Sequence, residues 1–187
     1  MAVAFKEQTG RNRVLDAAAE LFVAQGYAGT TLREIASAAG IKAGSIYHHF
    51  DSKEALFVAI LNNGMTVMLD AFDDAAIDGS LGAHVHAHLS AVFENGPYTT
   101  AHVTSFYSAP VEVRVQVVPV RDSYEQKWAE LFGRLFGGST ITERRLHRLI
   151  LFGAMNASAE WFDPGGDLTL DQLAATISNQ FLHGVQS

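Results

Sequence analysis

The chain has 187 residues, of which 48% are hydrophobic and 18% charged, a composition typical of a folded globular protein. It contains no cysteine, which excludes disulfide bonds and thiolate chemistry and agrees with a reducing compartment. The first thirty residues carry charges throughout, unlike a signal peptide, and no uncharged apolar run approaches the length of a membrane span. We therefore expect a cytoplasmic protein with no membrane partner.

The net charge of −7 has the wrong sign for a protein that binds DNA, but it is unevenly distributed. Residues 1–56 carry six Lys and Arg and six Asp and Glu, so the whole acidic excess lies in residues 57–187. Contact with phosphates depends on where charge is presented rather than on the total. Composition alone leaves both an N-terminal DNA-binding segment and an ordinary acidic protein open.

Three helices are predicted in the N-terminal third of the chain. Apolar residues in 11–25 recur at the spacing of one helical face, and Gly26 is expected to end this helix because glycine readily adopts the left-handed conformation. Thr31-Leu32-Arg33-Glu34 has the pattern of a capping box and begins a second helix, which stops at Gly40. A short third helix is predicted from Ala43 to His49.

A long helix follows, capped by Asp51 or Ser52 and reaching at least Phe72, with Gly64 as a candidate interruption. A cap at Thr142 is expected for one of the later helices. These later helices are predicted over residues 80–95, 98–108, 142–162 and 169–184.

The segment 110–136 contains Pro119, which predicts a break near Val118 because proline lacks the backbone N–H and clashes with the preceding turn. Residues 111–120 alternate valine with polar residues, a pattern that on its own indicates a strand. An isolated strand would have no partner here, so helix or coil is expected. The chain as a whole predicts an all-α fold of about nine helices without a sheet.

The second and third helices, joined by Gly40-Ile41-Lys42, have the arrangement of a helix-turn-helix, in which the second helix can lie in a major groove of DNA. Many helical bundles contain a helix–glycine–helix stretch. The more specific signal is the content of residues 42–49, which pair small residues with hydrogen-bond donors and are anchored by Ile46 and Phe50. Small residues allow a helix N-terminus to approach base edges and phosphates closely.

Residues 13–61 resemble the DNA-binding domain of TetR-type repressors. The resemblance rests on an alanine-rich first helix and on motifs spread over the segment: Phe22, Gly26-Tyr27, Thr30-Thr31, Ile35-Ala36, Gly40-Ile41, Tyr47-His48-His49-Phe50 and Ser52-Lys53-Glu54. It implies a three-helix DNA-binding domain over residues 1–55 and a larger helical domain over 56–187 that binds a ligand and forms a homodimer through the last two helices. The expected protein is a transcriptional regulator, most simply a repressor, and not an enzyme.

The same resemblance implies which residues face DNA, mostly its phosphates. These are Thr31, Arg33, Lys42, Ala43, Gly44, Ser45, Tyr47, His48 and Lys53. Thr31 and Lys53 begin helices, so each could offer a phosphate a backbone N–H together with a side-chain donor. Two alternatives stay open at this point: Tyr47 as a core aromatic ring, and Arg33 as a solvated helix residue.

The C-terminal domain is rich in aromatic residues and methionines, which at helical spacing are more often core than cavity wall. A cavity lined by some of them would accept a small apolar effector that releases the protein from a palindromic operator. The candidate ligand contacts are Met65, Met68, Phe72, Phe106, Trp128, Phe152 and Asn156. The helix that begins at Ser52 carries Met65, Met68 and Phe72 and is the expected lever between ligand and DNA.

Small residues in the middle of segment 142–162 suggest a close helix–helix approach at the dimer interface; they are Gly153, Ala154, Ala157 and Ser158. Leu173, Ile177 and Phe181 of the last helix are expected to complete it. Packing within one chain would explain the same residues.

Residues 158–174 resemble the Trp-aromatic-x-Pro-Gly-Gly segment of a TetR-type subgroup that senses acyl-CoA thioesters, which makes an acyl-CoA or a fatty acid a candidate effector. A turn between the two dimer helices is the alternative. An acyl-CoA site should also have cations near its cavity, and residues 156–159 offer none.

Histidines provide the main rival hypothesis. His84 and His88 are spaced i, i+4 on one helix, a spacing that can chelate zinc, and His102 is a third candidate ligand. A helical metalloenzyme or a ligand carrier would be the corresponding alternative function. Surface histidines or polar lining of a cavity are the alternative to a metal site. No Cys, Asp or Glu lies in register with these histidines, so we expect neither a metal site nor a cofactor.

Overall fold

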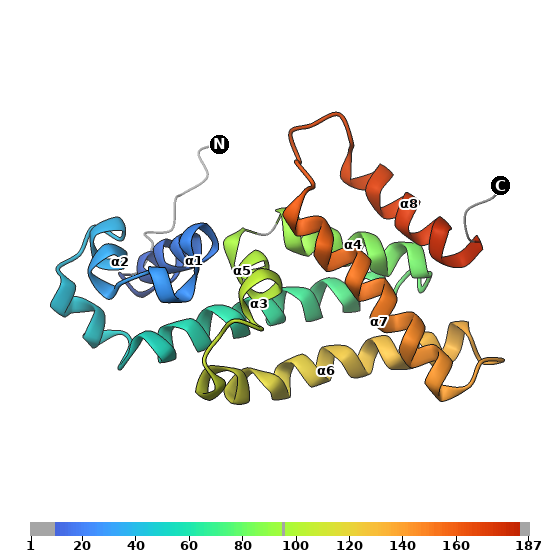
Figure 1. Cartoon of the computed structure of the whole chain (residues 1–187), viewed down its shortest axis with the longest axis horizontal. Helices are drawn as coiled ribbons and strands as arrows, with labels where there is room; N and C mark the ends of the chain where they lie inside the picture. Colours follow the sequence, from blue (N-terminus) through green and yellow to red (C-terminus); the bar gives the residue numbers. More distant parts are fainter. Residues whose placement is uncertain (1–9, 95, 184–187) are drawn as a thin grey trace.

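The computed structural model describes residues 10–94 and 96–183, and these residues form helices and no strand, which confirms the predicted all-α fold. At one end of the molecule lies the reading head (Figure 1), the name used here for α1 (Gly10–Gly29), α2 (Leu32–Ala38) and the 3-10 helix η1 (Ala43–His48). The long helix α3 (Lys53–Ala75) leaves the reading head and runs toward the opposite end.

The remaining helices form the larger part of the molecule (Figure 1). They are α4 (Leu81–Glu94), α5 (Pro97–Ser105), α6 (Val111–Leu135), α7 (Ile141–Ala157), the 3-10 helix η2 (Ser158–Glu160) and α8 (Leu170–His183). Of these, α5 packs against both α1 and α3, so it lies between the reading head and the rest of the protein.

Helix starts follow local hydrogen bonding. Thr31 and Glu34 form the predicted capping box of α2, each side chain bonding to the backbone of the other residue. At α3 the cap is Ser52, whose Oγ accepts from the Ala55 N–H at 3.0 Å. The cap of α7 is Thr140 rather than the predicted Thr142, because Thr140 is the residue that forms a capping box.

Two hydrophobic clusters hold the molecule together. One joins α1, α2 and η1 to the first half of α3 and to parts of α5 and α6, and the other joins the second half of α3 to α4, α6, α7 and α8. The domain boundary predicted at residues 55 and 56 falls inside α3, which contributes to both clusters. This helix is long and apolar enough to pass a composition test for a membrane span, but its apolar face packs in the protein core.

The break predicted near Val118 is wrong, since α6 continues through Pro119. Proline removes one hydrogen bond to the carbonyl four residues earlier, that of Val115. Both Val115 and Pro119 are exposed, so water can hydrate that carbonyl, while Val113 and Val117 bury the opposite face. Burial of Val113 and Val117 therefore stabilises a continuous α6 by more than the loss of one backbone hydrogen bond at Pro119 destabilises it.

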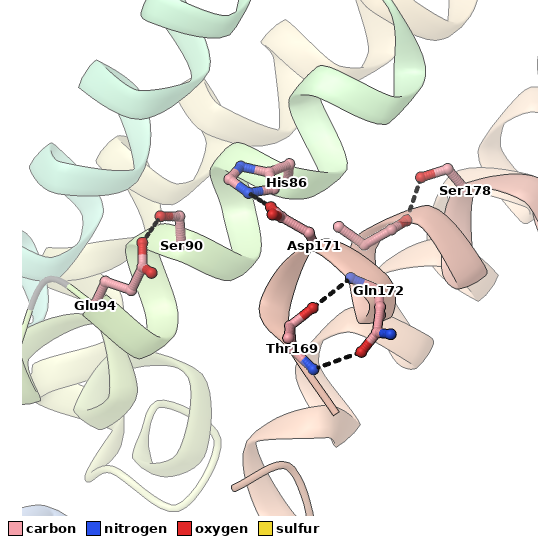
Figure 2. Close-up of polar contacts among 8 residues, drawn as sticks. His86, Ser90, Glu94, Thr169, Asp171, Gln172 and Ser178 are labelled. Atoms are coloured by element: carbon pink, nitrogen blue, oxygen red, sulfur yellow. Dashed lines mark hydrogen bonds and ion pairs between the residues drawn. The ribbon is translucent and has the colours of Figure 1, made fainter. Parts of the chain in front are cut away.

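The last helix packs against α4. Figure 2 shows His86 of α4 bonded to Asp171 of α8 at 2.8 Å, and the start of α8 capped by reciprocal bonds between Thr169 and Gln172. The predicted end of this helix at Gly184 lies outside the described residues.

Candidate DNA-binding face and ligand cavity

The reading segment η1 is held by two apolar anchors. Ile46 is fully buried and Phe50 nearly so, as predicted, while Gly40 supplies the turn before the segment with a φ of 67°. The side chains around the anchors point to solvent: Lys42, Ala43, Tyr47 and His48 are exposed, and Ser45 is half-buried. Tyr47 is 60% exposed, so it is not the core aromatic ring of the alternative interpretation. The anchors thus present a donor-rich outer face.

Lys53 is engaged within the reading head. Its ammonium donates to the Tyr27 carbonyl and lies 4.1 Å from the centre of the Tyr27 ring. Burial lowers the pKa of Lys53. Burial and a hydrogen bond that the Tyr27 hydroxyl donates to Glu54 at 2.6 Å raise the pKa of Tyr27, and the same bond lowers the pKa of Glu54. These bonds fasten the start of α3 to the end of α1. A phosphate at this helix start would meet an ammonium that is already oriented.

At the start of α2, Glu34 occupies two of the donors that a phosphate would use. Its carboxylate accepts from the N–H and the hydroxyl of Thr31, both at 2.8 Å, and these bonds lower the pKa of Glu34. The Glu34 N–H donates to Thr31 Oγ1 at 3.2 Å, so within the first helical turn the backbone N–H groups of Leu32 and Arg33 are left for an anion. Arg33 is exposed beside them.

A cavity of about 440 Å³ lies among α3, α4, α5, α6 and α7, within the size range of small-molecule sites. Its apolar wall comes from Met65, Met68, Val103, Phe106, Leu149 and Phe152. Polar and charged groups also reach it, from His88, His102, Tyr107, Arg121, Tyr124, Glu125, Asn156 and Glu160. The site is therefore a mainly apolar pocket with a few polar groups.

His88 is the centre of a buried polar group at the cavity, the His88 network, formed with Tyr124 and Asn156. Its Nδ1 lies 2.9 Å from the Tyr124 hydroxyl and its Nε2 lies 3.1 Å from Asn156 Oδ1. Burial lowers the pKa of His88 to about 4, so its imidazole is neutral at pH 7, and burial raises the pKa of Tyr124. The network contributes hydrogen-bonding groups but no net charge.

The arginine at the cavity wall is paired. Arg121 lies 3.3 Å from Glu125, donates to the Tyr107 hydroxyl at 2.6 Å and stacks on the rings of Phe106 and Tyr107. Glu125 also pairs with Arg148 at 3.2 Å. The cation at the wall is thus already matched by a carboxylate.

Five of the seven predicted ligand contacts line this cavity: Met65, Met68, Phe106, Phe152 and Asn156. Phe72 and Trp128 do not, because they are buried against one another and against His84 in the second hydrophobic cluster. Sequence patterns do not predict Tyr124 as a cavity residue, and they predict His88 only as one of several histidines that could bind a metal, lie at the surface or line a cavity. The wall function of these residues depends on the packing of α4, α6 and α7, which no local pattern reveals.

The histidines of the rival hypothesis face different partners. The Nδ1 of His84 lies 2.7 Å from the Ser80 carbonyl, and the Nδ1 of His102 lies 3.2 Å from the Leu61 carbonyl. No group of three metal-ligating side chains occurs among the residues that the structure describes. The metalloenzyme and carrier alternatives are not favoured.

The cavity connects to the reading head through two helices. Met65 and Met68 belong to α3, whose first residue is Lys53. His102 and Val103 belong to α5, where Tyr98 donates a hydrogen bond to Asp16 of α1. A group that displaces the cavity wall therefore acts on both helices that touch the head.

A helix-turn-helix head joined by shared helices to a cavity-bearing helical domain defines a DNA-binding transcriptional regulator with a ligand domain. The chain belongs to the TetR family. Residues 14–60 match the description "Bacterial regulatory proteins, tetR family", and residues 74–185 match "Tetracyclin repressor-like, C-terminal domain".

Known proteins agree with this assignment along most of the chain. The HTH-type transcriptional repressor KstR2 of Rhodococcus jostii is 30% identical over 95% of this chain and 91% of its own length. KstR2 of Mycolicibacterium smegmatis is 45% identical over 94% of this chain and 90% of its own length. Among solved structures, the TetR family regulator PfmR of Thermus thermophilus superposes with a TM-score of 0.79 at 25% identity, covering 94% of this chain and 100% of that one. AibR, solved in complex with isovaleryl coenzyme A and operator DNA, shares the fold with a TM-score of 0.81 at 23% identity, over 92% of this chain and 97% of AibR.

Proposed function

We propose that the protein is a homodimeric repressor that binds a palindromic operator in the cytoplasm and is released when a small, mainly apolar effector enters the cavity. The observation that carries this proposal is the position of the cavity, whose wall includes α3 and α5, the two helices that also contact α1. An effector can shift DNA affinity only by binding the two conformations of the protein differently. Because α3 and α5 form part of the cavity wall and also contact α1, a conformation that moves the reading head also changes the cavity, and the effector can bind the two conformations with different affinity.

The outer face of the reading segment is proposed to contact DNA. Lys42, Ser45, Tyr47 and His48 provide donors, while Ala43 and Gly44 lack bulk and allow close approach. Thr31, Arg33 and Lys53 flank this face at the starts of α2 and α3. Their proposed partners are phosphates, since helix starts favour anions.

An acyl-CoA thioester or a fatty acid remains the candidate effector class. Support comes from the isovaleryl coenzyme A bound to AibR and from the resemblance of residues 158–174 to an acyl-CoA-sensing subgroup. The Pro-Gly-Gly segment also forms a local turn, in which Gly165 and Gly166 donate to Asp163. That turn accounts for the motif without a ligand.

The test begins with DNA selected from a random library by the purified protein, followed by footprinting of the selected sequence. We expect protection of two inverted half-sites about one helical turn, ~10 base pairs, or somewhat more apart. Lys42→Ala and Tyr47→Ala together should abolish selection without unfolding the protein, since both side chains are exposed. An asymmetric site bound by monomer would contradict the proposal.

Release is tested by adding fatty acids, acyl-CoA thioesters, aromatic compounds or coenzyme A alone to the complex and following fluorescence anisotropy. A true effector should lower operator affinity about 5- to 150-fold. Met68→Trp would fill part of the cavity and should mimic or block that effect, whereas Thr66→Trp, on the exposed side of α3, should not. An unchanged response in a folded Met68→Trp variant would remove this cavity as the effector site.

A further inference from the structure

The His88 network limits the chemistry of the molecule that the cavity can hold. His88 and Tyr124 are buried within it, and Asn156 is half-buried. Because the imidazole is neutral, one ring nitrogen donates and the other accepts. With Nε2–H donating to Asn156 Oδ1 and the Tyr124 hydroxyl donating to Nδ1, the Asn156 amide N–H and a lone pair of the Tyr124 oxygen are left for a ligand.

The opposite tautomer of His88 exchanges these roles. Nδ1–H would then donate to the Tyr124 oxygen, and a flipped Asn156 amide would donate to Nε2. The Tyr124 O–H and the Asn156 carbonyl oxygen would be left for a ligand. In both arrangements the network offers one donor and one acceptor, which suits a ketone or ester carbonyl, or a hydroxyl.

A carboxylate would fit this position poorly. The charged side chains that line the cavity are Arg121, Glu125 and Glu160. Arg148, which is not a lining residue, also pairs with Glu125, so both arginines already have a carboxylate partner. Arg121 is already paired with Glu125 and bonded to Tyr107. An anion against the His88 network would lose its water without gaining a cation.

We propose that the cavity selects ligands with an apolar body and a neutral carbonyl or hydroxyl group, bound by Asn156 and Tyr124 and oriented through His88. The inference rests on the proposed function, since it names the chemistry of the same effector site. It predicts that any anionic part of an effector lies away from the network. Tyr124 and Asn156 are then the residues that determine specificity.

Three naphthalene probes of nearly equal size test this selection by isothermal titration calorimetry on the full-length protein: 2-acetylnaphthalene, 2-ethylnaphthalene and 2-naphthoate. The ketone should bind about tenfold more tightly than the hydrocarbon, as one net hydrogen bond predicts, and at least tenfold more tightly than the carboxylate at pH 7. Equal affinities, a preference for the carboxylate, or no binding of any probe would overturn the proposal.

The double variant Asn156→Leu/Tyr124→Phe lacks the donor of both arrangements and should lose the preference for the ketone, while continued binding of 2-ethylnaphthalene verifies that the cavity is intact. Asn63→Leu, on the exposed side of α3, is the matched control and should keep the preference. If the double variant does not fold, the two single variants replace it, and the preference should be lost in the one that lacks the donor: Asn156→Leu for the first arrangement and Tyr124→Phe for the second. Retention of the preference in the folded double variant, or in both single variants, would overturn the assignment.

Operator binding by the same preparations separates this inference from the proposed function. DNA binding and ligand-dependent release without a ketone preference would contradict the inference alone. A ketone preference that depends on Asn156 or Tyr124, in a protein that selects no DNA, would contradict the proposed function alone.

Discussion

Lys53 combines two roles that a single substitution can separate. Its ammonium holds the Tyr27 carbonyl in the free protein, and it is also proposed to contact a phosphate. Lys53→Ala should lower the salt dependence of operator binding by about one unit of slope, because one counterion fewer is released, and should weaken binding to all sequences similarly. The measurement is operator affinity over a range of salt concentrations.

Lys127 provides the control for this experiment. It is a lysine of α6 paired at 2.7 Å with Asp73, which lies near the end of α3 and not at the start that joins the reading head, so Lys127→Ala should leave the slope unchanged. A Lys53→Ala variant that melts at a lower temperature but keeps the parental slope would show that Lys53 stabilises the reading head and does not contact a phosphate.

Two buried histidines make stability sensitive to acid. Burial lowers the pKa of His88 and of His102 to about 4, below the ordinary value of 6.5. Between these values the unfolded chain binds protons that the folded protein does not, so stability falls as the pH drops from about 6.5 toward 4. The loss amounts to about 3 kcal/mol for each histidine.

His102→Leu should reduce that loss, which urea unfolding at pH 7.5 and at pH 5 would measure. Lowered carboxylate pKa values act in the same direction, but they are common to variant and parent. His183→Gln, at an exposed position of α8, should keep the parental pH dependence. Equal losses in the His102→Leu variant and the parent would show that His102 is not buried in its neutral form.

At the level of helices, α3 and the start of α5 approach each other closely at Gly64. A Cβ atom at this position would lie 2.5 Å from the carbonyl oxygen of Tyr98, so backbone must move. Gly64→Ala should lower the free energy of unfolding by about 1–3 kcal/mol, the usual cost of overpacking, and should change operator affinity by displacing α5. Chemical denaturation and anisotropy would measure the two effects.

Gly133→Ala is the matched control, since an added Cβ on this exposed residue of α6 meets nothing within 4 Å. Alanine is also the better helix former, so this variant should be slightly more stable than the parent. A Gly64→Ala variant that is equally stable would show that α3 and α5 can separate at little cost.

Sequence reasoning succeeded for helices that local chemistry specifies. The capping box of Thr31 and Glu34 and the apolar spacing of α1 gave correct helices, because both signals act within a few residues. It failed at Pro119, where burial of Val113 and Val117 keeps α6 continuous. That outcome depends on tertiary packing, which periodicity does not reveal.

The candidate site likewise has one part that a local motif predicts and one part that only tertiary packing reveals. The exposed face of η1 follows from its sequence motif, whereas the His88 network joins residues of three helices, 36 and 68 positions from His88 along the chain. Leu173 is buried, and Ile177 and Phe181 are partly buried against the second cluster of their own chain, which agrees with the alternative of packing within one chain; their contribution to a dimer interface stays a prediction.

For the whole molecule, the unpartnered apolar surface of α7 is the proposed dimer contact. Leu146 and Ile150 are 55% and 56% exposed, and the small residues Gly153, Ala154 and Ala157 are exposed on the same helix. Leu146→Glu with Ile150→Glu would bury unpaired charge in such an interface. Sedimentation should then show a folded monomer with at least tenfold weaker operator binding.

The control for this experiment is Val115→Glu, an exposed valine of α6, which should remain dimeric. If the double variant sediments as a dimer, the interface lies on another surface.

The placement of Trp128 gives the protein a built-in optical reporter. The chain has two tryptophans, of which Trp128 is fully buried, 5.4 Å between ring centres from the cavity residue Phe152, and Trp161 is 59% exposed. In a Trp161→Phe variant all indole emission would come from beside the cavity, blue-shifted by its apolar surroundings. Occupancy of the cavity could then be followed by fluorescence in real time, without labels and without DNA.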